Sequence, residues 1–229
     1  MSRNLQQSLQ RLYGLLQRGK QFGLERMQQA CADFGHPERS FRAIHVGGTN
    51  GKGSVCAFTA SMLRAQGKRV GLFTSPHLNR FAERIQIDGA PIADDTLARL
   101  IEEVMDRAPD LTFFEAATVL AFLAFREAKV DWAVMEVGLG GRLDATNVLP
   151  PPVVAAITRV SFDHMDVLGS SLSEIAREKA AIIKAGSKVV VGRLHPDAQL
   201  EVERRCAEVG AELLQLGDAE PYQGAQLAY

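Results

Sequence analysis

The sequence predicts an α/β fold in which a mostly parallel sheet is flanked by helices. Short, continuous apolar segments of strand length alternate along the chain with longer segments of helical periodicity. This alternation is typical of a parallel sheet that is covered on both faces. A glycine-rich turn also joins an early strand directly to a helix. The clearest apolar segments are Trp132–Met135, Val153–Ile157 and Val189–Val191.

Periodicity and stop signals define the elements in the first half of the chain. Apolar residues recur at helical spacing near the N-terminus, Gly35 and Pro37 end the second helix, and the turn Asp88-Gly89 predicts a hairpin. In order, the expected elements are helices over Leu5–Gln17 and Leu24–Phe34, a strand over Ala43–Val46, a helix over Ser54–Gln66, a strand over Arg69–Thr74 and the hairpin over Ala82–Ile92.

The second half of the chain continues the alternation of helices and strands. One helical segment is apolar nearly all round, which indicates a buried helix, and Ser171 with Glu174 forms a capping box at the start of another. Around the three apolar strands, the expected elements are helices over Asp94–Arg107, Glu115–Ala128, Ser171–Lys184 and Pro196–Val209, and a last strand over Glu212–Leu216.

The composition is ordinary for a globular protein. The 229 residues are 46% hydrophobic and 23% charged with a net charge of −1, which fits one large or two small domains and argues against nucleic-acid or membrane-surface binding. The longest apolar run, Val119–Phe125, is too short to span a bilayer. Cys31, Cys56 and Cys206 lack metal-ligand spacing, so we expect reduced thiols and a cytoplasmic location.

The segment Val46-Gly-Gly-Thr-Asn-Gly-Lys-Gly-Ser54 predicts a polyphosphate site. The backbone N–H groups of such a turn, the dipole of the following helix and the charge of Lys52 converge on one point. The spacing departs from the standard P-loop, because Val46 replaces its first glycine and Gly53 separates Lys52 from the Ser54 hydroxyl. The alternative is a tight glycine turn with a solvated lysine, which the strand–helix context disfavours.

Polar residues follow several predicted strands at the edge where an open parallel sheet binds ligands. Ser75 and Glu136 carry the oxygen ligands that Mg²⁺ prefers, and His164 would complete the metal shell or accept a proton. Two alternatives remain, namely that Glu136 pairs with Arg142 and that His164 is structural. His45 lies inside a predicted strand and is expected to be a core residue.

Lys179 borders the apolar stripe of its predicted helix. Either its stem packs on the core while the amine reaches water, or the amine is partly desolvated and has a lowered pKa. The spacing alone favours the first interpretation.

A second glycine-rich loop, residues 138–147, follows a strand without clearly opening a helix, so we expect it to line a site. Asp144 and Asn147 would hydrogen-bond a polar heterocycle there, or would hold a turn through Asx hydrogen bonds.

Six motifs, read in order, resemble the folylpolyglutamate synthases of the Mur ligase superfamily, and specifically the bacterial bifunctional dihydrofolate synthase/folylpolyglutamate synthases. The resemblance covers about residues 23–186 and implies a P-loop NTPase-like Mur-ligase central domain. Residues 1–229 would then be the N-terminal ATP-binding domain, without the family's C-terminal glutamate-ligase domain. The motifs are Gly48–Ser54, Thr74–Leu78, Glu83–Ile85, Glu136–Asn147, Asp163-His164 and Arg177–Ala180.

This resemblance implies an ATP-dependent ligase of folate biosynthesis. A dihydropteroate or folate carboxylate would form an acyl phosphate, which L-glutamate then attacks, and the enzyme would be a monomer. The residues implied for the ATP phosphates are Gly48, Thr49, Asn50, Gly51, Lys52, Gly53 and Ser54. Those implied for two Mg²⁺ ions are Ser75, Glu136 and His164, and those for catalysis are Lys52, Lys179 and His164. Those implied for dihydropteroate are Thr112, Phe114, Leu143, Asp144 and Ala145.

The resemblance also implies that Lys179 is carboxylated, which favours the second interpretation of that residue. The segment Lys20-Gln21-Phe22 departs from the family's pattern at positions that contact the pterin. Two other functions stay open beside the ligase. One is a P-loop kinase or NTPase of another class. The other is a nucleotide-binding fragment without ligase activity, which would expose an apolar patch.

Overall fold

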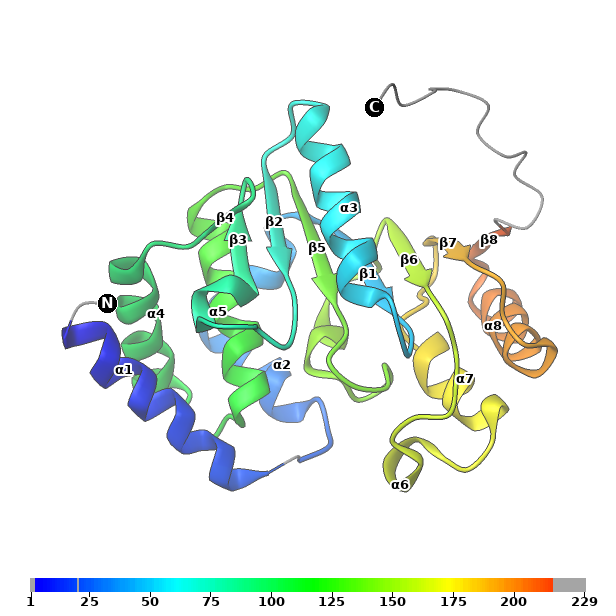
Figure 1. Ribbon diagram of the computed structural model, residues 1–229, viewed down its shortest axis with the longest axis horizontal. Coiled ribbons are helices and arrows are strands. Elements are labelled where there is room, and N and C mark those ends of the chain that lie inside the picture. The colour runs from blue at the N-terminus through cyan, green and yellow to red at the C-terminus, as the bar shows by residue number, and fades with distance from the viewer. Residues whose placement is uncertain (1–2, 20, 216–229) are drawn as a thin grey trace.

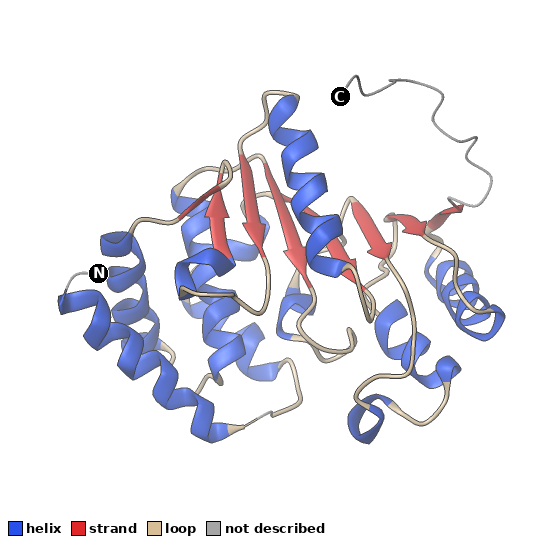
Figure 2. Cartoon of the chain, in the orientation of Figure 1, coloured by secondary structure: helices blue, strands red, loops and turns tan. Residues whose placement is uncertain are grey.

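An eight-stranded, mostly parallel sheet forms the centre of the computed structural model, which describes residues 3–19 and 21–215 (Figures 1 and 2). Lys20 and the predicted strand end at Leu216 therefore lie outside the described residues. The strand order is β4-β3-β2-β5-β1-β6-β7-β8, and β3 alone runs opposite to the other strands, pairing antiparallel with both β2 and β4. The strands are β1 (Arg42–Gly47), β2 (Val70–Phe73), β3 (Ile85–Ile87), β4 (Ala90–Pro91), β5 (Trp132–Glu136), β6 (Val154–Ile157), β7 (Lys188–Val191) and β8 (Glu212–Gln215).

Helices cover the two faces of the sheet unequally. Figure 1 shows α3 on one face of the central strands and α5 on the opposite face, with α1, α2 and α4 beyond α5. The helices are α1 (Arg3–Gly14), α2 (Glu25–Asp33), α3 (Lys52–Ala65), α4 (Asp94–Arg107), α5 (Phe113–Glu127), α6 (Met165–Leu168), α7 (Leu172–Ala180) and α8 (Pro196–Val209). Short 3-10 turns are η1 (Leu15–Arg18), η2 (Pro37–Arg39), η3 (Phe81–Arg84) and η4 (Ala145–Val148).

The helix α5 is the centre of the largest hydrophobic core. Every residue from Glu115 to Phe125 is buried, as its nearly uniform apolar sequence predicts. Phe122 and Phe125 are fully buried beside Phe73 of β2 and the inner residues of α1 and α4. Burying such aromatic side chains contributes about 2 kcal/mol each, so this half of the fold holds the sheet edge rigidly.

The helices α7 and α8 lie on the same face of the sheet as α5. Ala155 and Ile157 of β6 pack with these helices, whereas Ala156, between them, faces α3. Successive side chains alternate between faces, so the other face of β6 meets α3, whereas Figure 1 shows no helix over that face of β7 and β8 among residues 3–19 and 21–215. The predicted covering of both faces therefore holds for β1, β2 and β5 but not for this edge.

The sheet brings the predicted site segments together. In the parallel register Val46 lies beside Glu136, Gly47 beside Ile157, and Phe73 beside Met135. The strands β1, β2, β5 and β6 thus end along one edge. The expected convergence of the strand ends is confirmed.

Most predicted elements are confirmed, and three boundaries differ in ways that matter for the site. Helix α3 begins at Lys52 rather than Ser54, so Lys52 belongs to its first turn. Helix α5 begins at Phe113, because Thr112 and Glu115 form a capping box that the apolar pattern alone does not reveal. Helix α7 has its predicted capping box but ends at Ala180, and not at Lys184.

Candidate functional site

The turn between β1 and α3 presents free backbone donors at a helix N-terminus. Gly51 caps the helix with a φ of 82°, a left-handed conformation that favours glycine. The N–H groups of the first helical turn, at residues 52–54, have no partner within the helix. The amine of Lys52 lies 3.1 Å from the carbonyl oxygens of both Gly48 and Thr49. The same turn therefore carries both a cation and amide donors without a helical partner, as a polyphosphate site requires.

The first residues of the same turn anchor it to the segment that follows β6. The Thr49 N–H donates to the Arg159 carbonyl at 2.6 Å, and its Oγ1 exchanges two 3.1 Å hydrogen bonds with the Ser161 backbone. Gly48 has a φ of 139°, and a Cβ there would overlap the Thr158 hydroxyl. The Thr49 amide therefore donates within the protein, and the N–H groups available to a ligand are those of residues 52–54.

Glu136, the last residue of β5, is a buried carboxylate beside this turn. It is 4% exposed, and its Oε2 accepts a hydrogen bond from the Ser75 N–H at 2.9 Å. A Cβ added at Gly53 would lie 3.7 Å from both carboxylate oxygens, so the carboxylate faces the phosphate turn. Burial raises the pKa of Glu136, and the Ser75 hydrogen bond and the charge of Lys52 partly oppose that rise.

The alternative fate of Glu136, a salt bridge to Arg142, is wrong. Arg142 instead donates from Nε to Glu178 at 2.8 Å. Glu136 therefore lacks the arginine partner that commonly neutralises a buried acid.

Lys179 of α7 is buried against the phosphate turn. Lys179 is only 3% exposed, and its Nζ donates to the Gly48 carbonyl at 3.2 Å. Burial, reinforced by the charge of Lys52, lowers the pKa of Lys179 to about 8. The interpretation in which the amine reaches water is wrong, and the desolvated amine is confirmed. Spacing alone could not show this, because the residues that cover the amine come from β1's turn, far away in sequence.

Lys52, Lys179 and His164 line one small cavity of about 40 Å³, together with the glycine-rich segment that follows β5. His164 has a φ of 47° and a half-exposed side chain. It also borders the larger cavity described next. The structure therefore brings together the three residues for which the family resemblance implies catalytic roles.

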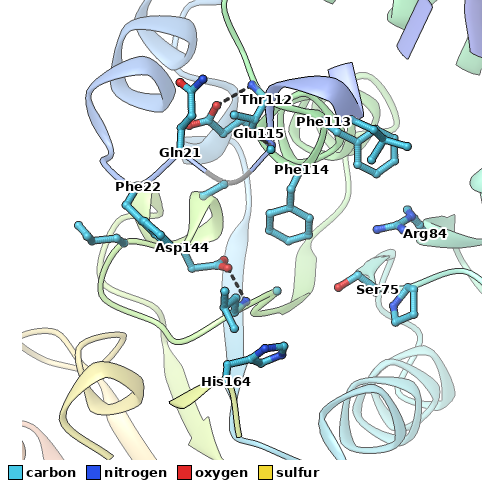
Figure 3. A pocket seen from close by; sticks show the side chains of 17 residues that line it. Gln21, Phe22, Ser75, Arg84, Thr112, Phe113, Phe114, Glu115, Asp144 and His164 are labelled. Atoms are coloured by element: carbon cyan, nitrogen blue, oxygen red, sulfur yellow. Dashed lines mark hydrogen bonds between the residues drawn. The ribbon is translucent and has the colours of Figure 1, made fainter. Parts of the chain in front are cut away.

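A larger cavity of about 490 Å³ opens beside this cluster (Figure 3). Its walls are mainly apolar, with Phe113 and Phe114 from the start of α5 and Phe22 from the N-terminal segment. All the residues predicted to bind dihydropteroate lie in its lining, namely Thr112, Phe114, Leu143, Asp144 and Ala145. A concave, mostly apolar space with a few polar groups is typical of a small-molecule site.

Asp144 shapes the loop that closes this cavity. Its Oδ2 accepts from the Leu139 N–H at 2.8 Å, and its Oδ1 accepts from the Thr146 N–H at 3.0 Å. The Asx-turn interpretation is thus correct for Asp144, which still borders the cavity. Asn147 donates to the Arg142 carbonyl at 3.1 Å and does not line this cavity.

His45 is confirmed as a core residue that supports the same loop. It is fully buried, and its Nε2 lies 2.8 Å from the Thr146 hydroxyl. Burial lowers its pKa to about 3, so the imidazole is neutral.

Sequence reasoning missed several residues that line the larger cavity, and Arg84 is the most important. Its place in the predicted hairpin gave no sign of burial, whereas the residue is only 7% exposed. Glu115 was signalled by the pattern Thr112-x-x-Glu115, a capping box before an apolar helix. The other lining residues outside the predicted set are Leu16, Gly19, Gln21, Phe22, Pro76, Phe113, Gly138 and Leu139.

The described residues, 3–19 and 21–215, contain no cluster of three or more His, Cys, Asp and Glu side chains arranged to hold a metal ion. A magnesium site completed by hydroxyl and phosphate oxygens would not form such a cluster. Across those same residues, no helix has both the length and the apolar character needed to cross a bilayer.

Comparison with known proteins agrees with this geometry. Residues 46–223 match the family model of the Mur ligase middle domain. The chain is 46% identical over 206 residues to the dihydrofolate synthase/folylpolyglutamate synthase of Bacillus subtilis, covering 86% of this chain and 47% of that protein. It thus spans about half the length of the curated relatives that it matches.

Solved structures give the same result. A folylpolyglutamate synthase (FPGS) in complex with AMPPCP and folate matches with a TM-score of 0.83 and 38% identity, over 92% of this chain and 53% of that one. Escherichia coli FolC in complex with DHPP and ADP matches with a TM-score of 0.87 and 35% identity, over 93% of this chain and 51% of that one.

Proposed function

This chain belongs to the Mur ligase family, within its group of folylpolyglutamate and dihydrofolate synthases, and from this premise we propose that it is the N-terminal, ATP-binding part of an ATP-dependent ligase. Residues 1–229 form this part. The enzyme adds L-glutamate to dihydropteroate, to folates or to both, in folate biosynthesis. We further propose that it is monomeric and cytoplasmic, and the three buried, unpaired cysteines fit a reducing compartment.

One observation carries the proposal. The small cavity at the phosphate turn and the larger apolar cavity have lining residues in common. Gly138, Leu139 and His164 line both the small cavity with the two lysines and the larger cavity with the phenylalanines. A carboxylate on a flat substrate in the larger cavity would therefore lie next to the terminal phosphate of ATP. Positioning of this kind accounts for much of the catalysis of phosphoryl transfer.

In the proposed first step, a carboxylate oxygen of the substrate attacks the γ-phosphorus of ATP while the bond to the ADP oxygen breaks. Lys52 and the amides of Gly53 and Ser54 stabilise the charge that collects on the phosphate oxygens. The amine of glutamate then attacks the acyl carbon of the acyl phosphate, phosphate leaves, and the amine loses a proton. That proton goes to solvent, and His164, at the border of both cavities, is the residue proposed below to hold the second Mg²⁺.

The residues present fit a magnesium site. Glu136 is a buried carboxylate whose only hydrogen bond among the described residues is the one from Ser75, and its second oxygen is free to bind a cation. Such a buried acid is costly without a cation. We propose that Ser75 and Glu136 hold one Mg²⁺ and that His164 holds a second. Bound Mg²⁺ would neutralise phosphate charge.

Lys179 fits carboxylation by CO₂. An uncharged amine is the nucleophile for this reaction, and burial lowers the pKa of Lys179 to about 8, so a sizeable fraction is uncharged near neutral pH. The nitrogen lone pair forms the N–C bond and the nitrogen loses a proton, which converts a buried cation into an anion beside Lys52. We propose this carbamate as part of the site.

The proposal is tested by isothermal titration calorimetry of MgATP, with and without dihydropteroate. Three proteins are compared, namely the unaltered chain, Lys52→Ala, and Lys68→Ala as a control. Lys68 is exposed in the connection between α3 and β2. Micromolar binding that dihydropteroate tightens, that Lys52→Ala loses and that Lys68→Ala keeps would support both sites. An absence of MgATP binding to all three would contradict the proposal for this chain.

Family membership excludes a P-loop kinase of another class, but the fragment without ligase activity keeps one supporting observation. Phe58 and Met62 lie one turn apart on α3 and are 69% and 60% exposed. Two adjacent apolar side chains are a small exposed surface of the kind that such a fragment is expected to show. Measurement of phosphate release with dihydropteroate and glutamate separates the two functions, because the fragment would bind MgATP without turnover.

A further inference from the structure

Arg84 places a buried positive charge at the wall of the larger cavity. The residue is 7% exposed and is the last residue of the η3 turn, directly before β3. Figure 3 shows its guanidinium directed toward the space between Phe114 and Ser75. Burial lowers the pKa of Arg84, and electrostatic interactions with Tyr13 and then Glu136 partly oppose this effect. The guanidinium nevertheless remains charged at any physiological pH.

No carboxylate in the described part of the chain lies within ion-pair distance of Arg84, although buried arginines are usually paired. The single hydrogen bond given by its guanidinium runs from Nε to Nδ1 of His77, at 2.7 Å. The two terminal nitrogens have no partner among the described residues, and they are not fully enclosed by protein. They therefore face the cavity, where a ligand can reach them.

The direction of the guanidinium is fixed by its neighbours. Its central carbon lies 5.8 Å from the ring centre of Phe81 and 5.4 Å from that of Phe113. His77, which accepts the Nε hydrogen bond, has its Nε2 at 3.5 Å from the Tyr13 hydroxyl. Tyr13 in turn stacks on Phe113, with the ring centres 5.6 Å apart. A cation held this rigidly loses little conformational freedom when it binds an anion.

We infer that Arg84 binds the carboxylate that this ligase activates, and that the cavity is built for an aromatic acid whose flat rings lie beside Phe114. This inference rests on the proposed function. A planar guanidinium with two free terminal nitrogens matches a carboxylate in a bidentate manner. Lys52 and the N-terminus of α3 already provide the positive charge that a polyphosphate needs, so Arg84 is available for a different anion. The remaining wall is mainly apolar, which suits an aromatic body better than a second phosphate.

The consequence is a specificity determinant. A ligand with the same rings but no carboxylate leaves the buried guanidinium unpaired, and a site built for a charged partner rejects such an analogue strongly. We expect the unaltered chain to prefer dihydropteroate over its decarboxylated analogue by ten- to a hundredfold, which is the usual range for a lost hydrogen bond to a charged group.

Isothermal titration calorimetry of both ligands tests this. In Arg84→Gln, the ratio of the two dissociation constants is expected to fall to about one, because only the carboxylated ligand loses a partner. In Arg84→Lys, which keeps the charge but not the planar fork, the ratio is expected to be intermediate. Arg99→Gln is the control, because Arg99 is exposed and pairs with Glu127 on the helix surface. Its ratio is expected to equal that of the unaltered chain, and thermal unfolding confirms that each variant is folded.

The outcomes are separable. A full preference for dihydropteroate in both Arg84 variants would overturn the inference while leaving the proposed function intact. Equal weakening of both ligands by Arg84→Gln would also overturn it, since that is the signature of a purely structural residue. If the unaltered chain binds AMPPCP but not dihydropteroate, the proposed function fails and the inference fails with it.

Discussion

The amine of Lys179 donates a hydrogen bond to the carbonyl oxygen of Gly48, 3.2 Å away, and so joins helix α7 to the phosphate turn. The two residues are far apart in sequence, and the contact forms only because β1 and α7 meet at the edge of the sheet. It places a nucleophilic amine of lowered pKa, about 8, where an anion would complete the proposed magnesium site.

Carboxylation of Lys179 can be observed directly. With ¹³C-bicarbonate, the unaltered chain is expected to show a carbamate carbon signal by NMR, and Lys179→Met is expected to lack it. Lys184→Met is the control. Lys184 has a similarly lowered pKa, also about 8, but its amine is bound by the carbonyls of Asn147 and Leu149. The signal should therefore persist in Lys184→Met. Its loss in that variant would place the carbamate on Lys184 and contradict the prediction.

Glu136→Gln is expected to stabilise the metal-free chain while abolishing its response to magnesium. Burial raises the pKa of this carboxyl, so at neutral pH its ionised form opposes folding. A neutral amide removes that cost, on the order of 1 kcal/mol, and its carbonyl can still accept from Ser75. The measurement is thermal unfolding with EDTA and then with Mg²⁺ and AMPPCP. The exposed Glu127→Gln serves as a control with a normal magnesium response, and a magnesium response retained in Glu136→Gln would remove this residue from the metal site.

Gly138→Ala is expected to impair the larger cavity while leaving the phosphate turn intact. A Cβ at Gly138 would overlap the ring of Phe114, and the ring would have to move into the space meant for the substrate. We expect at least tenfold weaker dihydropteroate binding with unchanged AMPPCP binding, and partial recovery in the double variant with Phe114→Leu. Gly14→Ala is the control, because a Cβ there meets no atom within 4 Å. Unchanged dihydropteroate affinity in Gly138→Ala would show that the substrate does not use this wall.

Much of the fold follows from the sequence because its signals are local. The continuous apolar strand Trp132–Met135 and the uniformly apolar helix α5 need a buried position wherever they lie. The turn at residues 47–54 likewise carries its own chemistry. These features predict the parallel sheet and the location of a phosphate site at its edge.

The remaining features depend on contacts between distant segments. Lys179 borders an apolar stripe and Arg84 lies in a hairpin, positions that do not by themselves predict burial, yet each is buried by residues from other elements. The Thr49 N–H donates to the carbonyl of Arg159, which follows the neighbouring strand β6. The turn therefore offers fewer free N–H groups to a ligand than its sequence suggests. Periodicity describes one element at a time and cannot report such tertiary burial.

His45 makes the stability of the chain sensitive to acid. Its Nε2–H donates to the Thr146 hydroxyl, whose own proton goes to Asp144, and its Nδ1 is buried without a partner. Protonation would bury an unpaired N–H⁺, so the folded pKa falls to about 3, well below the unfolded value of about 6.5. Between these values the unfolded chain binds the extra proton. Stability is therefore lost as the pH falls from about 6.5, by on the order of 1 kcal/mol per pH unit.

Chemical denaturation of the unaltered chain and of His45→Gln should give free energies of unfolding that converge as the pH falls, because glutamine does not titrate. Parallel pH profiles would show that His45 is not the titrating group.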